Sequence, residues 1–455
     1  MPRKRTLERL VIWLIRLIAD TFFRRIEVVG AENVPANGPV IFAGNHPNAL
    51  MDGWLLAAKS VRWPLYFLAN AKLWNFRMLA PILNATGAVP VYRREDHDGD
   101  VDNTSAFARL YEVIESGECV CIFPEGVSHV ESQLVKLKTG TARVALTVAS
   151  RGRIVAPIVP CGLNYIHRHR FRSQVLIQFG DPITVDNEWL RKFHVDEQKA
   201  AVELTDRLTD ALRDVTVNTP DWRTLRFIQS ARRLYKPSSA QLTPQQYVEL
   251  NRRFANQYVK ERDDPKLQAL TADLENYQAR LDLLGLKDHQ LRQPMTVSHA
   301  FRKIVLRSVT LLALLPLAVP GALLHLPIGW IAAAVGERFS YEMDDVATLK
   351  VFSTILVLPL LYLAVSVTVG MQFGFWWGIA LFVGLPFSFL ASVRLVEAEV
   401  SLVMSMLSIF RLARLGRELE DLRITRADLV KRIRDRVERV VDADVDRIFT
   451  NEDFS

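Results

Sequence analysis

The prediction of the fold starts from one stretch, Val40-Ile-Phe-Ala-Gly-Asn-His-Pro-Asn-Ala-Leu-Met-Asp52. An apolar run of strand length leads into the turn Asn45-His46-Pro47, and helix-forming residues follow. A buried strand that passes through a short turn into a helix is the repeating unit of an α/β sheet. Ligands of such sheets bind at the carboxyl ends of the strands, so His46 is placed where chemistry is expected.

Similar runs alternate on both sides of this stretch, between Glu27 and Gly180. The expected strands are Ile26–Val29, Val40–Gly44, Leu65–Ala69, Ala88–Val91, Cys119–Phe123, Ile154–Pro160 and Val175–Phe179. The expected helices are Ala49–Lys59, Trp74–Leu83, Thr104–Ser116 and Gly140–Ser150. Strands separated by helices predict an α/β fold.

The first candidate for chemistry is the pair His46 and Asp52. Asp52 is expected about one turn inside the helix, where its carboxylate can reach back to one imidazole nitrogen. A carboxylate in that place fixes the tautomer of His46 and makes the ring a candidate general base. The alternative for the pair taken alone is an ordinary acidic residue near a helix start.

Two further expected strands also end in polar groups. Ala88-Val-Pro-Val-Tyr-Arg-Arg94 ends in two arginines, whose forked guanidinium groups suit phosphate. Cys121-Ile-Phe-Pro-Glu-Gly-Val-Ser128 ends in a turn, where Glu125 can orient an arginine or a hydroxyl. A solvated arginine pair and a turn carboxylate are the alternatives, each reasonable singly but weak for the whole set.

The distribution of charge and hydropathy indicates a protein that binds a membrane surface. The chain has 455 residues and a net charge of +7, and its basic residues flank apolar segments. No zinc-finger or RNA-binding signature accompanies them, which argues against nucleic acid. The three cysteines offer no disulfide framework and suit a reducing compartment, and Cys119 and Cys121 are interpreted as buried packing.

The apolar segments lie at both ends of the chain. Residues 1–25 are interpreted as an uncleaved interfacial helix, with an ordinary docked helix as the alternative. Val351–Val369 and Phe373–Val393 are each about long enough to span a bilayer and form an expected hairpin. Ile304–Val335 contains three prolines and is expected to be one kinked span, re-entrant or interfacial.

The remaining segments are helical and polar. The tail, residues 396–455, has an amphipathic helical pattern and is expected to pack on the protein or on lipid headgroups. The predicted division is 1–25, interfacial helix; 26–195, α/β domain; 196–297, helical extension; 298–395, membrane-embedded region with a hairpin at 351–393; and 396–455, charged helical tail.

Four segments in order carry a family resemblance: Asn45-His46 through Asp52, Gly87 through Arg93, Phe123 through Gly126, and Val155 through Pro160. They resemble the four blocks of the PlsC-like glycerolipid acyltransferase superfamily, which includes glycerol-3-phosphate and lysophosphatidic acid acyltransferases. The resemblance implies a mixed sheet flanked by helices, followed by a helical extension and a C-terminal membrane helix region.

The resemblance also implies roles for single residues. His46 is the general base and Asp52 its partner. The acceptor phosphate is expected to contact Arg93, Arg94, Glu125, Gly126 and Lys138. The fourth block lines the acyl or acceptor pocket, and no metal site is expected. The basic run from His167 to Arg172 either binds phosphates of coenzyme A or acidic lipid, or is a solvated loop.

Two departures from the usual pattern are informative. Five residues separate His46 from Asp52 where most members have four, and Val127-Ser128-His129 stands where many members have Thr-Arg-Ser. Both departures resemble the fungal-type branch of glycerol-3-phosphate/dihydroxyacetone-phosphate acyltransferases. Arg94, Lys138 or His129 is then expected to replace the missing arginine.

The implied function is a membrane-bound enzyme of phospholipid biosynthesis with its catalytic domain facing the cytoplasm. It moves a fatty acyl group from acyl-CoA or acyl-ACP, without a bound cofactor, to glycerol 3-phosphate or a related acceptor. One alternative is a 1-acylglycerol-3-phosphate or lysophospholipid acyltransferase. Another is a non-catalytic lipid-binding membrane protein, which the intact His46, Asp52, Glu125 and Gly126 argue against.

Overall fold

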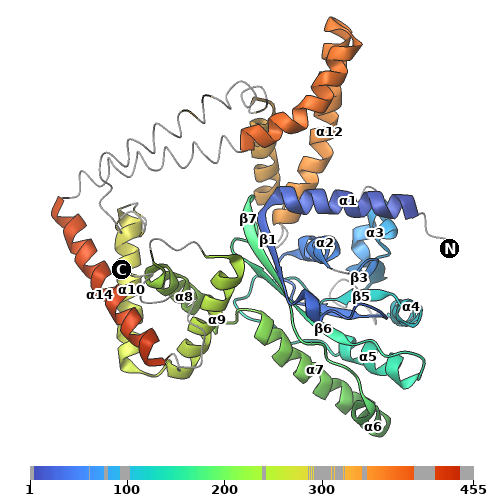
Figure 1. Ribbon diagram of the computed structural model, residues 1–455, viewed down its shortest axis with the longest axis horizontal. Coiled ribbons are helices and arrows are strands. Elements are labelled where there is room, and N and C mark those ends of the chain that lie inside the picture. The colour runs from blue at the N-terminus through green and yellow to red at the C-terminus, as the bar shows by residue number, and fades with distance from the viewer. Residues whose placement is uncertain are drawn as a thin grey trace. The chain divides into compact units, whose positions relative to one another are not determined.

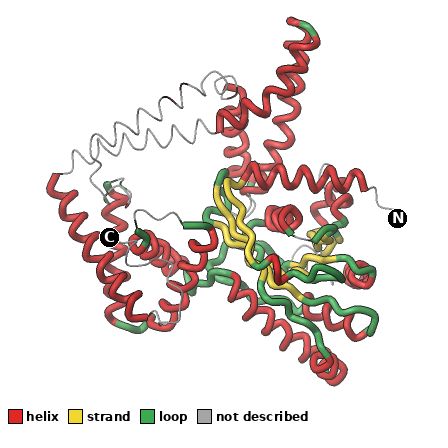
Figure 2. The backbone as a smooth tube through the Cα atoms, viewed as in Figure 1, coloured by secondary structure: helices red, strands yellow, loops and turns green. Residues whose placement is uncertain are grey.

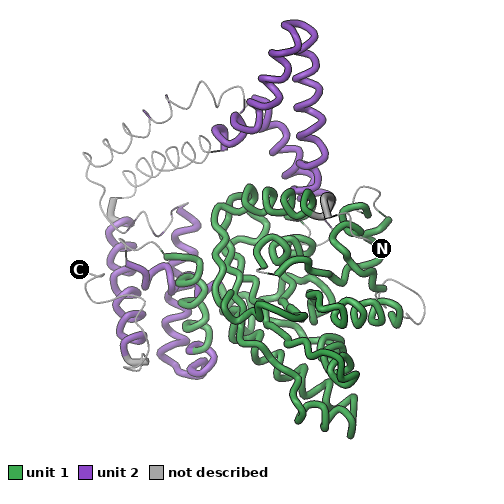
Figure 3. Tube along the Cα trace, turned by 45° about the vertical axis from the view of Figure 1, so that its right-hand side comes forward, with its two compact units in different colours: residues 1–225, 242–256, 341–348 green, residues 226–241, 257–340, 349–455 purple. Residues whose placement is uncertain are grey.

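The computed structural model describes residues 5–60, 62–75, 80–92, 103–237, 242–284, 323–340, 346–393 and 416–440, with the single residues 286, 288, 291, 309, 312 and 321. The chain divides into two compact units, shown in Figure 3. The first comprises residues 1–225, 242–256 and 341–348, and the second comprises 226–241, 257–340 and 349–455.

A seven-stranded sheet forms the centre of the first unit (Figures 1 and 2). Its strands are β1 (Phe23–Val29), β2 (Ile41–Gly44), β3 (Leu65–Asn70), β4 (Val89–Val91), β5 (Cys119–Ile122), β6 (Ile158–Tyr165) and β7 (Ser173–Phe179). Their spatial order is β1-β7-β6-β2-β5-β3-β4. Only β6 and β7 pair antiparallel among these strands, so the predicted mixed sheet is confirmed.

Helices cover both faces of this sheet (Figure 1). They are α2 (Ala49–Lys59), α3 (Ala80–Thr86), α4 (Thr104–Glu115), α5 (Gly140–Ser150), α6 (Asn187–Val195) and α7 (Glu197–Val215), with short 3₁₀ turns at Ala31–Asn33 and Ala71–Asn75. The central strand β2 is therefore buried on both sides, and Ile41, Phe42 and Ala43 are 0% exposed. Burial on both faces explains why this strand is a continuous apolar run without alternation.

Two expected elements differ from the structure. The strand expected at Ile154–Pro160 is instead β6, Ile158–Tyr165. Its first half pairs with β2 and its second half with β7, so Pro160 lies inside the strand and does not end it. The helix expected at Trp74–Leu83 is wrong, because a 3₁₀ turn ends at Asn75 and α3 starts at Ala80, with residues 76–79 outside the described part.

The N-terminal helix α1 (Arg5–Phe22) docks on the first unit by one face. Ile12, Ile15 and Ala19 are buried, and the helix contacts α2 and α3. Arg16 also ties the helix to protein, because its Nε donates to the carbonyl of Ala58 in α2 at 3.2 Å. The opposite face remains apolar and exposed, at Leu10, Trp13 and Leu17. The helix is thus docked on protein while keeping the row of side chains that an interfacial helix requires.

The second unit contains a packed pair of helices, α10 (Pro265–Leu283) and α14 (Gly416–Val440). Leu422, Leu429 and Ile433 on α14 are buried. Arg432 pairs with Asp273 of α10 at 2.7 Å, and other arginines of α14 pair with Glu261, Asp264 and Asp288. This part of the tail therefore packs on protein. Helices α8 (Trp222–Tyr235) and α9 (Pro244–Glu261) have residues in both units.

Two helices among the described residues are long and apolar enough to cross a membrane, α12 (Val346–Phe373) and Phe375–Val393. Gly374, with φ +104°, joins them, and glycine adopts that backbone conformation without strain. Of the first apolar stretch, the structure describes helical residues 323–339. There His325 Nδ1 lies 2.6 Å from the carbonyl of Gly321, and its Nε2 lies 2.6 Å from the hydroxyl of Tyr362 in α12.

Candidate active site

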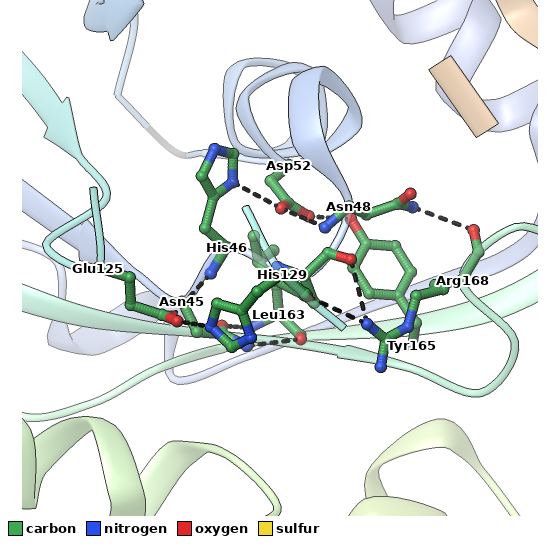
Figure 4. Close-up of polar contacts among 10 residues, drawn as sticks. Asn45, His46, Asn48, Asp52, Glu125, His129, Leu163, Tyr165 and Arg168 are labelled. Atoms are coloured by element: carbon green, nitrogen blue, oxygen red, sulfur yellow. Dashed lines mark hydrogen bonds and ion pairs between the residues drawn. The ribbon is translucent and has the colours of Figure 1, made fainter. Parts of the chain in front are cut away.

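His46 and Asp52 meet at the carboxyl end of β2 (Figure 4). His46 lies in the turn after the strand, and Asp52 lies in the first turn of α2. The imidazole Nδ1 is 2.9 Å from Oδ2 of Asp52, and the Asp52 side chain is completely buried. The His46 side chain is 14% exposed and stacks on Phe123 at a ring distance of 4.1 Å. A fixed, slightly exposed imidazole beside a buried carboxylate is the arrangement of a general base.

The partners of Asp52 assign the tautomer of His46. Oδ2 accepts from Nδ1 of His46 and also from the backbone N–H of Asn48 at 2.7 Å. Oδ1 accepts from the hydroxyl of Tyr165 at 2.5 Å. A carboxylate in this position calls for a proton on Nδ1 and leaves the lone pair of Nε2 available for a substrate proton.

The extra residue between His46 and Asp52 fits through a tight turn. Ala49, the first residue of α2, has φ +43°, in the left-handed region that side chains disfavour. Asn48 before it is completely buried, and its Nδ2 donates to the carbonyl of Arg168 at 3.0 Å. The turn is therefore held by the loop that follows β6, next to the residue with the left-handed backbone.

Glu125 connects the third sequence block to the first. Its completely buried side chain accepts from the backbone N–H of His46 at 3.0 Å through Oε1 and contacts Nε2 of His129 through Oε2. Nδ1 of His129 accepts from the backbone N–H of Glu131, which fixes the orientation of the ring beside Glu125. Burial raises the pKa of Glu125 to about 7. The Glu125 side chain therefore holds the backbone of His46 and the ring of His129 in place from a buried position.

Lys138 lies against the Pro-Glu-Gly turn. Gly126 has φ +75°, and a Cβ placed there would lie 2.6 Å from Nζ of Lys138. The backbone N–H of Lys138 donates to the carbonyl of Pro124 at 2.7 Å. The positive φ therefore favours glycine at 126, and the end of the Lys138 side chain lies over it. The ammonium group lies beside the turn that was predicted to face the acceptor.

The structure brings His46, Asp52, Glu125, Gly126 and Lys138 to one end of the sheet. Arg93 and Arg94 lie outside the described residues, two and three positions after the end of β4. No group of His, Cys, Asp and Glu residues suited to a metal ion occurs in the described part of the chain.

Sequence reasoning missed Tyr165, Asn48 and the position of Arg168. Arg168 donates to the carbonyls of Pro47 and His129, each at 3.3 Å, so it links both loops and is more than a solvated basic residue. Asn45 of the first block also holds β6, because its side chain exchanges hydrogen bonds with the backbone of Leu163. A signal for Tyr165 existed in the alternation Cys161, Leu163, Tyr165, which continues the strand beyond Pro160.

Comparison with known families supports an acyltransferase domain in the first unit. Residues 25–164 match the family described as acyltransferase. Residues 227–441 match the family described as glycerol-3-phosphate acyltransferase 2 C-terminal domain. The resemblance stated from the sequence is confirmed: one part of the chain is similar to an acyltransferase domain and another to the glycerol-3-phosphate acyltransferase 2 C-terminal domain.

Curated relatives point the same way. Glycerol-3-phosphate O-acyltransferase 2 of Saccharomyces cerevisiae is 34% identical over 59% of this chain and 38% of its own length. An uncharacterized acyltransferase of Schizosaccharomyces pombe is 27% identical over 77% of this chain and 66% of its own length. The chloroplastic 1-acyl-sn-glycerol-3-phosphate acyltransferase LPAT1 of Arabidopsis thaliana is 27% identical over 37% of this chain and 47% of its own length. The chain thus spans between about two fifths and two thirds of the length of these relatives.

Proposed function

We propose that this protein is a membrane-bound O-acyltransferase that moves a fatty acyl group from a thioester to a hydroxyl of glycerol 3-phosphate or a related glycerol phosphate. The observation that carries the proposal is the His46–Asp52 pair, with Nδ1 held at 2.9 Å from the buried carboxylate and Nε2 left for substrate. The match to an acyltransferase family over residues 25–164 supports the class of reaction.

The chemistry needs no covalent enzyme intermediate. Nε2 of His46 takes the proton of the acceptor hydroxyl as the oxygen attacks the thioester carbonyl. The new carbon–oxygen bond forms a tetrahedral intermediate, whose collapse breaks the carbon–sulfur bond and expels the thiolate. The imidazolium returns its proton to that thiolate, so His46 is unchanged after each turnover. Asp52 stabilises the imidazolium and holds the ring in place between the two proton transfers.

Recognition of the acceptor rests on positive charge beside the Pro-Glu-Gly turn. Lys138 covers Gly126, and Arg93 and Arg94 follow β4 in the sequence. Ammonium and guanidinium groups bind phosphate through charge-assisted hydrogen bonds. Glu125, which is completely buried, acts by holding the backbone of His46 and the ring of His129. A small glycerol phosphate can place its hydroxyl at Nε2 of His46 and its phosphate at these cationic side chains.

The donor and the membrane complete the proposal. The co-substrate is acyl-CoA or acyl-ACP, which is water-soluble, and the site therefore faces the cytoplasm. Two helices long and apolar enough to cross a bilayer, together with the exposed apolar row of α1, support membrane attachment. The same features support the alternative acceptor, a lysophospholipid that enters from the bilayer, as does the likeness to the plant enzyme.

Acyl transfer by the purified full-length protein tests the proposal. Glycerol 3-phosphate, dihydroxyacetone phosphate and lysophosphatidic acid are compared as acceptors, each with acyl-CoA and with acyl-ACP. Transfer to glycerol 3-phosphate is expected to be the most efficient, and preference for lysophosphatidic acid would establish the alternative. His46→Ala should lower turnover by roughly two to four orders of magnitude. An inactive wild type with every acceptor, or an active His46→Ala variant, would overturn the proposal.

A further inference from the structure

The proposed mechanism gives no role to the hydrogen bond between Tyr165 and Asp52. The hydroxyl of Tyr165 donates to Oδ1 of Asp52 at 2.5 Å. Oδ2, the other oxygen of Asp52, accepts hydrogen bonds from Nδ1 of His46 and from the backbone N–H of Asn48. Figure 4 shows Tyr165 beside Asp52, on the side away from the His46 ring. Each carboxylate oxygen is therefore occupied, and Tyr165 is the partner of Oδ1.

The position of Tyr165 is fixed by the sheet. It is the last residue of β6 and pairs with Val175 of β7, in the antiparallel part of the sheet. Its ring packs against Phe23 of β1 at a centroid distance of 5.8 Å. Three strands thus determine where the hydroxyl points, and Asp52 receives its hydrogen bond from a rigid part of the fold.

The hydroxyl is a permanent donor. Burial, and next the negative charge of Asp52, raise the pKa of Tyr165 well above its ordinary value. The phenol therefore keeps its proton throughout the pH range in which an enzyme is assayed, while the carboxylate accepts it.

We propose that Tyr165 is a positioning residue for acyl transfer, which orients Asp52 toward Nδ1 of His46 and draws part of the carboxylate charge away from the imidazole. The inference rests on the proposed function and deepens it. Without the hydroxyl, Oδ1 is a buried acceptor with no partner, and the carboxylate is free to turn away from the ring. The base then spends less time in the orientation that reaches the substrate hydroxyl.

The same contact has a consequence for pH dependence. A hydrogen bond to Oδ1 disperses the negative charge of Asp52, so its loss leaves more charge on the oxygen that faces His46 and favours the imidazolium. The acid limb of the pH–rate profile should then move to higher pH. Among the described residues, Glu125, Cys121 and Arg168 also interact electrostatically with Asp52 or Tyr165, and none of the three is altered when only the hydroxyl is removed.

Tyr165→Phe tests the proposal, because it keeps the ring and removes only the hydroxyl. Tyr277→Phe is the matched control: Tyr277 is also buried and donates to an aspartate, Asp288, at 3.0 Å within the second unit. Both variants of the full-length protein are assayed for kcat, for KM of donor and acceptor, for the pH profile and for melting temperature in detergent.

Tyr165→Phe is expected to lower kcat roughly 10- to 100-fold, the usual cost of a lost hydrogen bond to a charged group, with both KM values nearly unchanged. Its acid limb should move to higher pH. Tyr277→Phe should lose a similar amount of thermal stability and keep the wild-type kcat and pH profile. Wild-type kcat in Tyr165→Phe, or an equal loss in both variants with an unmoved acid limb, would overturn the positioning role.

Wild type and His46→Ala in the same assay separate the two proposals. An active wild type and an inactive His46→Ala uphold the proposed function, and the result with Tyr165→Phe then decides the role of Tyr165 alone. An inactive wild type overturns both.

Discussion

The carboxylate of Glu125 accepts a hydrogen bond of 3.0 Å from the backbone N–H of His46, across 79 positions of sequence. The backbone N–H of His129 returns a bond of 3.1 Å to the carbonyl of His46. The turn after β5 therefore holds the turn after β2 through both backbone polar groups of His46. Because these bonds join protein to protein, the proposed base is positioned before any substrate binds, which would lower the cost of reaching the reactive geometry.

Glu125 should make stability depend on pH. Burial raises its pKa in the folded protein to about 7, from the ordinary value of 4.5. Between these values the folded protein holds a proton that the unfolded chain has released, so stability falls as pH rises through this window. The loss is on the order of 3 kcal/mol at most. Glu125→Gln cannot release a proton, and its stability should stay flat over the window.

Melting temperatures in detergent between about pH 5 and pH 8 measure this difference in slope. Glu115→Gln is the control, because Arg151 lowers the pKa of Glu115 and its titration falls below the window. It should melt with the wild-type slope. Parallel curves for wild type and Glu125→Gln would mean that Glu125 is not protonated in the folded protein.

Ala49 should tolerate glycine better than a helical alanine does. Its φ of +43° costs a side chain about 1–2 kcal/mol, which glycine avoids. Glycine also lowers the stability of the folded state by about 0.4–1 kcal/mol, because it gives the unfolded chain more conformational freedom. Ala49→Gly is therefore expected to be neutral to about 1 kcal/mol stabilising. The β-branched Ala49→Val should destabilise and lower activity, since it pushes the turn that carries Asp52.

Ala57→Gly, in the middle of the same helix, is the matched control. It is almost completely buried and should cost about 1 kcal/mol or more. Equal losses for Ala49→Gly and Ala57→Gly, measured as melting temperatures, would argue against a left-handed residue at 49.

These contacts separate what the sequence could predict from what it could not. His46 and Asp52 lie on consecutive local elements, a turn and a helix start, so their meeting followed from helix geometry. The position of Tyr165 depends on where β6 ends, and that end is set by pairing with β7. The strand expected at Ile154–Pro160 stopped short of Tyr165, because pairing between distant strands is not a local signal. The bond from His46 to Glu125 and the backbone of Ala49 likewise arise from packing between distant segments. The apolar hairpin was predictable, because its signal is length and lack of charge.

Lys138 should contribute to binding of the acceptor. Its side chain covers Gly126 at the turn beside His46, and it is a candidate to replace the arginine that is missing from the third block of this chain. Lys138→Ala is expected to raise the KM of a glycerol phosphate by about tenfold or more, the scale of one charge-assisted hydrogen bond, and to leave the KM of the acyl donor nearly unchanged. Lys136→Ala, an exposed lysine two positions earlier, is the control and should change neither. Equal increases in both KM values would mean that Lys138 does not bind the acceptor selectively, and that it contributes to donor binding or to folding.

The last prediction concerns membrane topology. Arginine and lysine flank the apolar region on both sides, at Arg302, Lys303 and Arg307 before it and at Arg411, Arg414 and Arg417 after it. Both flanks therefore favour the cytoplasmic side, which calls for an even number of crossings. The helices α12 and Phe375–Val393 supply two. The first apolar stretch should then not cross once, although its helical residues 323–339 pack on α12 through His325 and Tyr362.

Cysteine labelling with a membrane-impermeant reagent on sealed vesicles decides between two and three crossings. The native cysteines Cys119, Cys121 and Cys161 are all buried, so labelling reports the introduced residue. Gln372→Cys, beside the turn of the hairpin, should be labelled from the far side only. Glu337→Cys and Glu420→Cys, both exposed, should be labelled from the cytoplasmic side. Far-side labelling at 337 or 420 would establish an odd number of crossings before that residue and make the first apolar stretch a true span, because the hairpin alone returns the chain to the side on which it began.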